Sequence, residues 1–232
     1  MMNPALEFNR ALVEKYDRPG PRYTSYPTAP QFHQAFAVDD YQRAAHDSNQ
    51  AAVPKPLSVY IHIPFCKSLC YYCACNKIIT QKTHRATEYL NYLKREINMQ
   101  AALFDSTRKL TQLHLGGGTP TYLTHEQLAD LMQHLHQAFD MDDSDNHEFS
   151  IEVDPRTISV ERINTLRRLG FNRLSFGVQD FDPEVQAAVN RVQSEAQILQ
   201  LVAAAREAHF KSVSVDLIYG LPLQTVASFD VT

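Results

Sequence analysis

The 232-residue sequence predicts an α/β fold with a parallel sheet, either open or closed into a barrel. Five strand candidates alternate along the chain with amphipathic segments, and such alternation is typical of parallel β-α-β units. Each strand candidate also alternates apolar residues with polar ones, as Val59 and Ile61 do with Tyr60 and His62. Because helices must cover the apolar side, we expect the polar side to line a wide cavity that holds a ligand.

Composition narrows the class of protein. Hydrophobic residues make up 44% of the chain and charged residues 21%, which excludes a disordered or fibrous protein. The 22 basic and 26 acidic residues leave a net charge of −4, so no nucleic-acid partner is expected. No apolar run reaches the length of a bilayer span, and the N-terminus does not read as a secretory signal. The sequence therefore predicts a cytoplasmic enzyme without a membrane span.

Residues 1–56 lack the regular alternation of strands and helices that begins at residue 57. They are interpreted as an N-terminal appendage to a barrel segment at 57–232. A short helix is predicted from Ala5 to Lys15, and it runs into a proline-rich turn. The segment Arg22–Pro27 then reads R-Y-T-S-Y-P, and a second weak helix is predicted around Val38–His46. We expect this appendage to wrap onto the main domain.

The barrel segment contains the five strand candidates, which are Leu57–Ile63, Gln112–Leu115, Phe149–Val153, Arg173–Val178 and Val213–Ile218. Helix signals separate them. Thr124 and Gln127 form a capping box, Ser159 and Ser194 each precede a further helix, and an Asp-Pro pair at 182–183 opens a short one. An antiparallel sheet with one solvated face is the less favoured alternative, because helices lie between the strands.

All four cysteines fall within ten residues, directly after the first strand candidate: Cys66, Cys70, Cys73 and Cys75. Because Pro64 ends that strand, they lie on the loop at its carboxyl end, where α/β proteins place their active sites. Spacings of four and three let a compact loop aim three thiolates at one centre, which suits a 4Fe–4S cluster better than structural zinc. Two alternatives stay open: a zinc loop that uses Cys75 or a histidine, and a group of redox thiols.

Glycines and carboxylates follow at the ends of later strands. Gly116–Gly118 come after the second strand, where they let the backbone approach a ligand and donate N–H groups, although a simple turn is the alternative. Glu152 and Asp216 fall on the polar sides of apolar strands, and a buried carboxylate there needs a partner or a ligand. An internal ion pair between Arg191 and Asp216 is the structural alternative.

The Cys-x3-Cys-x2-Cys pattern after a first strand resembles the radical S-adenosylmethionine superfamily. A narrower resemblance, from about residue 5 to the C-terminus, is to the oxygen-independent coproporphyrinogen III oxidases (dehydrogenases) of bacterial heme biosynthesis. It rests on Y-I-H-I-P-F before the first cysteine, Cys-Ala-Cys at 73–75, G-G-G-T-P-T at 116–121 and the R-Y-T-S-Y-P segment. The heme chaperone family is the alternative, because it shares the cluster and glycine motifs.

The resemblance implies a partial (β/α)6-type TIM-like barrel with an N-terminal appendage, truncated after about the fifth strand. The family barrel has a sixth strand and a C-terminal domain that covers the substrate. We therefore expect the 232-residue chain to be a fragment or a truncated product of a longer enzyme, with an unpaired sheet edge and a half-open cavity.

The resemblance also implies site residues. Cys66, Cys70 and Cys73 would hold the cluster, and Cys75 is not counted as a ligand. One S-adenosylmethionine would contact Tyr60, Gly117 and Glu152. A second molecule nearby would contact Tyr72, Gly118, Thr119, Gln179, Arg191 and Asp216. Core packing is the alternative role for the two tyrosines.

The implied reaction is the oxidative decarboxylation of two propionates of coproporphyrinogen III to vinyl groups, which gives protoporphyrinogen IX without oxygen. A 5′-deoxyadenosyl radical would take hydrogen from each propionate side chain. An electron donor such as flavodoxin or ferredoxin would reduce the cluster. Arg22 and Tyr26 are candidates for contact with a propionate, because arginine pairs well with carboxylates.

Overall fold

The computed structural model describes residues 8–19 and 26–232. The chain forms two compact units, residues 1–45 and 46–232. In the first, α1 (Arg10–Tyr16) begins after Asn9, whose side chain accepts a hydrogen bond from the backbone N–H of Leu12. The predicted start of this helix at Ala5 lies outside the described residues, as does Arg22.

Two further elements lie in the described N-terminal residues. A 3-10 turn, η1, spans Ala29–Gln31. The second predicted helix is confirmed as α2 (Val38–Asn49), which runs three residues beyond the expected end. The division into an appendage at 1–56 and a barrel segment at 57–232 stays a prediction.

All five strand candidates are confirmed, and they form one parallel sheet in the order β1-β4-β6-β7-β8. The strands are β1 (Leu57–Ile63), β4 (Lys109–Gly117), β6 (Glu148–Val153), β7 (Arg173–Gln179) and β8 (Ser212–Leu217). A two-residue strand, β5 (Asp140–Met141), pairs with the start of β4. The parallel order brings the carboxyl ends of all five long strands to one edge of the sheet.

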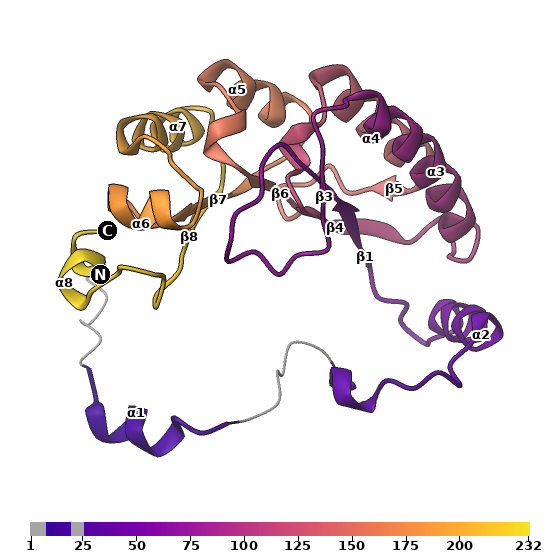
Figure 1. Ribbon diagram of the computed structural model, residues 1–232. Helices are drawn as coiled ribbons and strands as arrows, with labels where there is room; N and C mark the ends of the chain where they lie inside the picture. The colour runs from indigo at the N-terminus through magenta and orange to yellow at the C-terminus, as the bar shows by residue number, and fades with distance from the viewer. Residues whose placement is uncertain (1–7, 20–25) are drawn as a thin grey trace. The chain divides into compact units, whose positions relative to one another are not determined.

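Helices α3, α4, α5 and α7 lie along the outer side of the curved sheet (Figure 1). The helical segments that follow β1 are α3 (His84–Ala101), η2 (Pro120–Tyr122), α4 (His125–Ala138), η3 (Pro155–Thr157), α5 (Val160–Arg168), α6 (Pro183–Ala188), α7 (Glu195–Glu207) and α8 (Val226–Val231). The predicted caps at Thr124, Ser159, Asp182 and Ser194 each accept the expected backbone N–H. None of the described helices is long and apolar enough to cross a bilayer.

Helix α3 was not predicted, although its buried residues follow a helical spacing. Ala86, Leu90, Leu93 and Ile97 recur every three or four residues and pack into the core. Its first residue follows Thr83, whose side chain makes no capping hydrogen bond, so no start signal marks the helix. The spacing of its apolar residues was therefore the feature of the sequence from which this helix could have been predicted.

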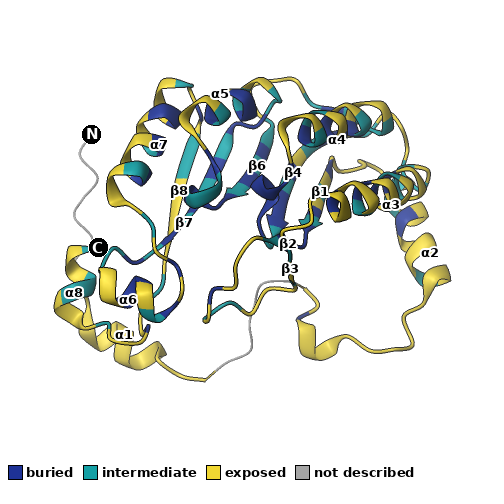
Figure 2. Ribbon diagram, turned by 45° about the horizontal axis from the view of Figure 1, so that its top comes forward, coloured by how far each residue is buried: buried dark blue, intermediate teal, exposed yellow. Residues whose placement is uncertain are grey.

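The hydrophobic core lies between the sheet and its helices, as the buried residues in Figure 2 show. On β6 and β7 every second residue is buried, which confirms the alternation of apolar and polar sides. On β8 the expectation that the apolar side meets a helix is wrong. Val213 packs against the core, but Val215 and Leu217 are 50% and 43% exposed on the strand that ends the order of the sheet.

Candidate functional site

The cysteine loop is closed at its base by a small parallel ladder. After Pro64 the chain forms β2 (Phe65–Cys66), which pairs with β3 (Ile78–Ile79). The N–H of Ile78 donates to the carbonyl of Pro64 at 2.7 Å, and that of Thr80 donates to the carbonyl of Cys66 at 3.0 Å. The ends of the loop are thus fixed beside the carboxyl end of β1.

A cavity of about 410 Å³ opens at this edge of the sheet. Its volume falls in the range of ~300–1,000 Å³ that is usual for small-molecule sites. The predicted residues that line it are Cys66, Cys70, Tyr72, Cys73, Gly117, Gly118, Thr119, Glu152, Gln179, Arg191 and Asp216. Residues from β1's loop and from the ends of β4, β6, β7 and β8 therefore meet in one place.

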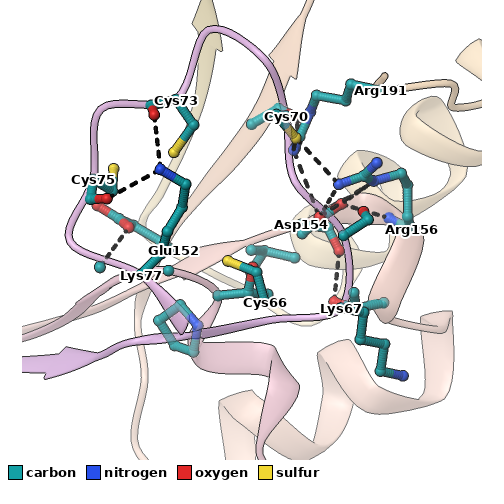
Figure 3. A pocket seen from close by; sticks show the side chains of 18 of the residues that line it. Cys66, Lys67, Cys70, Cys73, Cys75, Lys77, Glu152, Asp154, Arg156 and Arg191 are labelled. Atoms are coloured by element: carbon teal, nitrogen blue, oxygen red, sulfur yellow. Dashed lines mark hydrogen bonds and ion pairs between the residues drawn. The ribbon is translucent and has the colours of Figure 1, made fainter. Parts of the chain in front are cut away.

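Each thiol on the loop has its own surroundings. The Cys66 sulfur lies 3.4 Å from the hydroxyl of Thr119, and burial raises the pKa of the Cys66 thiol more than this hydrogen bond lowers it. The Cys70 side chain is buried. Lys77 donates to the backbone carbonyls of Cys73 and Cys75 at 2.8 and 3.3 Å, which holds the far side of the loop (Figure 3).

Gly117 and Gly118 are glycines for two different reasons. Gly117 has φ +115°, and a Cβ there would lie 2.8 Å from the His62 ring. A Cβ on Gly118 would lie 2.7 Å from the carbonyl oxygen of Pro64, which belongs to the backbone and cannot turn away. The N–H of Gly118 donates to the carbonyl of Ile63 at 2.8 Å, so this turn lies against the end of β1.

Glu152 is tied into the polar side of the sheet. Its carboxylate accepts the N–H of Gly117 at 3.1 Å and lies 3.4 Å from Nε2 of His114. The other ring nitrogen of His114 lies 2.6 Å from the Ser150 hydroxyl. The Glu152 side chain is still 43% exposed, which leaves carboxylate lone pairs free for a ligand.

The two predicted tyrosines occupy different places. Tyr60 does not line the cavity but lies beside it, stacked on the His114 ring at 5.7 Å between centroids. It is 58% exposed, so core packing is not its role. Tyr72 lines the cavity and also packs against a small apolar cluster that contains Val185 and Leu221. Burial raises the pKa of both phenols.

The alternative ion pair between Arg191 and Asp216 is wrong. Arg191 instead faces Asp154 at 3.5 Å and donates to the carbonyl of Gly177 at 2.6 Å. Asp216 is exposed and accepts a hydrogen bond from the Ser175 hydroxyl, which lies 3.2 Å from each of its carboxylate oxygens. Asp216 therefore reaches the cavity without a cationic partner from Arg191.

Sequence reasoning missed Asp154 and Arg156, which follow the end of β6 and line the cavity. Arg156 donates through Nη2 and Nε to the Asp154 carboxylate at 2.7 and 3.0 Å. Burial by itself would raise the pKa of the Asp154 carboxyl, but the hydrogen bond from Arg156 and the charges of Arg191 and Arg156 lower it overall. The sequence D-P-R-T directly after a strand candidate was the signal for these two residues. Charged residues at the carboxyl end of a parallel strand lie at the edge of the sheet where such proteins place their sites.

The donor set fits an iron–sulfur cluster. All four thiols of the loop line the same cavity, none is used in a disulfide, and N–H groups of two arginines point at one of them, Cys70. Thiolate ligands with hydrogen bonds to sulfur are the usual environment of such clusters. Carboxylate and amide groups lie in the same cavity, where they can hold an organic cofactor beside the thiols.

Comparisons with known proteins agree with this site. The sequence profile of the Radical SAM superfamily matches residues 60–232. The chain is 50% identical over 228 residues to the oxygen-independent coproporphyrinogen III oxidase of Escherichia coli and 47% identical over 228 residues to that of Pseudomonas aeruginosa. These matches cover 98% of this chain but only 48% and 49% of the two relatives.

A solved structure shows the same relationship. The solved structure of coproporphyrinogen III oxidase from Escherichia coli, described as a radical SAM enzyme, superposes with a TM-score of 0.85 at 48% identity. The match covers 97% of this chain and 49% of that one, so the chain spans about half the length of the relatives it matches. The fold is thus a partial radical SAM barrel, and the family implies a 4Fe–4S cluster and S-adenosylmethionine. This chain, homologous to oxygen-independent coproporphyrinogen III oxidases, belongs to the radical SAM superfamily.

Proposed function

We propose that this chain provides the cluster- and S-adenosylmethionine-binding part of an enzyme that decarboxylates coproporphyrinogen III without oxygen. The supporting observation is one cavity that unites the thiols of the cysteine loop with Glu152, Gly117 and Arg191. In this proposal Cys66, Cys70 and Cys73 hold the cluster. When bound, the cluster supplies the electron that cleaves S-adenosylmethionine reductively, and the residues of the chain bind and orient that molecule.

Glu152 and Gly117 are suited to hold the methionine end of S-adenosylmethionine. The exposed part of the Glu152 carboxylate can accept from its ammonium group, and the hydrogen bond from Gly117 fixes the carboxylate in place. Tyr60 stacks on His114 next to this carboxylate and donates to Nδ1 of His62 at 3.0 Å, so its ring forms a wall beside the site.

A second S-adenosylmethionine would lie toward β7 and β8. Gln179, Arg191 and Asp216 line that side of the cavity, and among the described residues the hydrogen-bond donor to Asp216 is a serine hydroxyl. A carboxylate and an amide of this kind can bind ribose hydroxyls or an ammonium group. Tyr72, Gly118 and Thr119 connect this side with the cysteine loop.

The proposed substrate comes from the names of the relatives, and the proposed electron donor from the family resemblance. The propionate side chains of coproporphyrinogen III would enter the cavity from its open side, in a cytoplasmic enzyme that takes electrons from a flavodoxin or ferredoxin. Water exclusion near the cluster would protect the reaction from side reactions.

The test is an anaerobic reconstitution of the chain with iron and sulfide, followed by reduction in the presence of S-adenosylmethionine. We expect methionine and 5′-deoxyadenosine as products of the chain. Transfer of deuterium into 5′-deoxyadenosine from coproporphyrinogen III labelled on its propionate chains is expected from a chain of the relatives' full length, because the 232-residue part can bind a cluster yet fail at turnover. Cleavage without label transfer, together with tight stoichiometric heme binding, would contradict the proposal and favour a heme chaperone. A chain that takes up zinc but no iron would contradict it as well.

Two variants sharpen the test. Glu152→Gln removes the charged acceptor and should weaken S-adenosylmethionine binding by about tenfold or more, with iron content unchanged. Glu148→Gln is the matched control, because Glu148 lies at the other end of β6 and pairs with Arg173 at 2.5 Å. Equal weakening by both variants would show that the effect is general rather than local to the cavity.

A further inference from the structure

Two guanidinium groups converge on one thiol of the cysteine loop. Arg156 Nη2 lies 3.6 Å from the Cys70 sulfur, and Arg191 Nη1 lies 3.5 Å from it (Figure 3). Cys70 is 8% exposed, so water competes little with these contacts. The Cys66 sulfur, in contrast, meets the neutral hydroxyl of Thr119.

Asp154 holds Arg156 in this orientation. Its carboxylate accepts from the Nε, Nη2 and backbone N–H groups of Arg156 at 2.7–3.1 Å. The same carboxylate caps η3, and the hydroxyl of Thr157 donates to the Asp154 carbonyl at 2.8 Å. A two-pronged contact of this kind fixes the direction of the guanidinium plane, which a single point contact would not do.

The backbone on both sides of Cys70 is also held in place. Asn190 donates to the carbonyl of Leu69 at 2.7 Å, and the N–H of Tyr71 donates to the carbonyl of Val189 at 3.1 Å. These bonds anchor the backbone on both sides of Cys70 to the connection between α6 and α7. The distance between Cys70 and the two arginines is therefore set by the fold rather than by flexible side chains.

The charges of Asp154, Arg156 and Arg191 do not sum to zero. One carboxylate faces two guanidinium groups, so a net positive charge lies next to a single sulfur. A reduced cluster carries one more negative charge than an oxidised one, and both positive charge and N–H groups at sulfur favour the reduced form. Uptake of the electron needs no proton from these residues, because arginine stays charged.

We propose that Arg156, held by Asp154, is a positioning residue that donates to the Cys70 thiolate and raises the reduction potential of the bound cluster. The proposal rests on the proposed function only in requiring that the cluster binds to Cys66, Cys70 and Cys73. Arg191 shares the contact but is also proposed to bind S-adenosylmethionine, so Arg156 gives the cleaner test.

The experiment measures the midpoint potential of the reconstituted chain without S-adenosylmethionine, by redox titration followed by electron paramagnetic resonance. In Arg156→Gln the ratio of reduced to oxidised cluster at a fixed potential should fall about tenfold, which equals a shift of about 59 mV for one electron. Arg156→Lys keeps the charge but loses the two-pronged contact, and it should show a smaller shift in the same direction.

Arg173→Gln is the matched control, because it removes an arginine that pairs with a carboxylate, Glu148, at the opposite end of the sheet. Its potential should equal that of the wild type. The potential is read only from clusters that are bound, so reduced iron uptake does not obscure it. If Arg156→Gln binds no cluster, the midpoint potential of Arg156→Lys tests the proposal in its place. A wild-type potential in the loaded variants overturns the inference, whereas a wild-type chain that binds no cluster overturns the proposed function instead.

Discussion

Gly118 brings the turn after β4 into contact with the backbone that leads to the cysteine loop. Gly118→Ala would place a Cβ 2.7 Å from the Pro64 carbonyl oxygen and 2.9 Å from that of Phe65. Because neither atom belongs to a flexible side chain, the loop must move, at a cost of about 1–3 kcal/mol in the free energy of unfolding. We expect weaker iron uptake, measured by anaerobic titration with iron and sulfide.

The control for this substitution is Gly220→Ala, where a Cβ would meet nothing within 4 Å and the residue lies outside the cysteine loop. Its φ of +78° adds backbone strain, so it loses stability without displacing the loop. If both alanine variants take up iron equally well, the close approach at Gly118 is not what positions the thiols.

Asp154 should give the stability of the chain a recognisable pH dependence. Its pKa in the folded chain is lowered, below the ~3.9 of an unfolded aspartate. The stabilisation is therefore complete above about pH 5 and is lost as the pH falls through the unfolded and then the folded pKa. Asp154→Asn leaves two arginines without their carboxylate and should cost roughly 3 kcal/mol near neutral pH.

Urea unfolding of the cluster-free chain at several pH values measures this effect. The difference between wild type and Asp154→Asn should shrink as the pH falls below about 5. Asp140→Asn is the control, because Asp140 forms an exposed pair with Lys109 at 2.8 Å and should cost less than about 1 kcal/mol. A difference that stays constant with pH would show that the Asp154 carboxylate does not carry the stabilisation.

The alternation of apolar and polar residues was enough to predict which side of the sheet Glu152 and Asp216 occupy. It was not enough to predict their partners. Arg191 could have paired with either Asp154 or Asp216, and the choice depends on how the connection between α6 and α7 passes over the sheet. A single sequence contains no signal for that path, because it is set by contacts between distant segments.

At the scale of elements, the β2–β3 ladder decides where the thiols lie. Ile78→Pro removes the N–H that donates to the Pro64 carbonyl and should open the base of the loop. We expect lower iron uptake and faster proteolysis between residues 66 and 79, measured by limited digestion and mass spectrometry. Ile78→Val is the control, because it keeps the N–H; equal digestion of the two variants would contradict the role of the ladder.

The long strands were predictable and the two-residue strands were not. β1, β4, β6, β7 and β8 each have six or more residues, so their alternation is visible in the sequence. β2 and β3 have two residues each, which is too few for any periodicity, and they pair only because the chain returns to Pro64. Helix α3 shows the intermediate case, with a clear apolar spacing but no cap.

At the scale of the whole molecule, the strand order explains why residues far apart in sequence share one cavity. Parallel strands in sequential order deliver five carboxyl ends to the same edge, from Cys66 after β1 to Asp216 on β8. This much follows from alternating strands and helices, so the sequence predicted the common edge. The exposed apolar side of β8 did not follow, since strand composition does not tell which helix covers it.

The most direct measurement is the iron content and reductive S-adenosylmethionine cleavage of four serine variants of the reconstituted chain. We predict that Cys66→Ser, Cys70→Ser and Cys73→Ser each lose most of their iron and all cleavage. Cys75→Ser should keep its iron, because its exposed thiol is not counted among the ligands. Wild-type iron and cleavage in any of the first three variants would contradict the account.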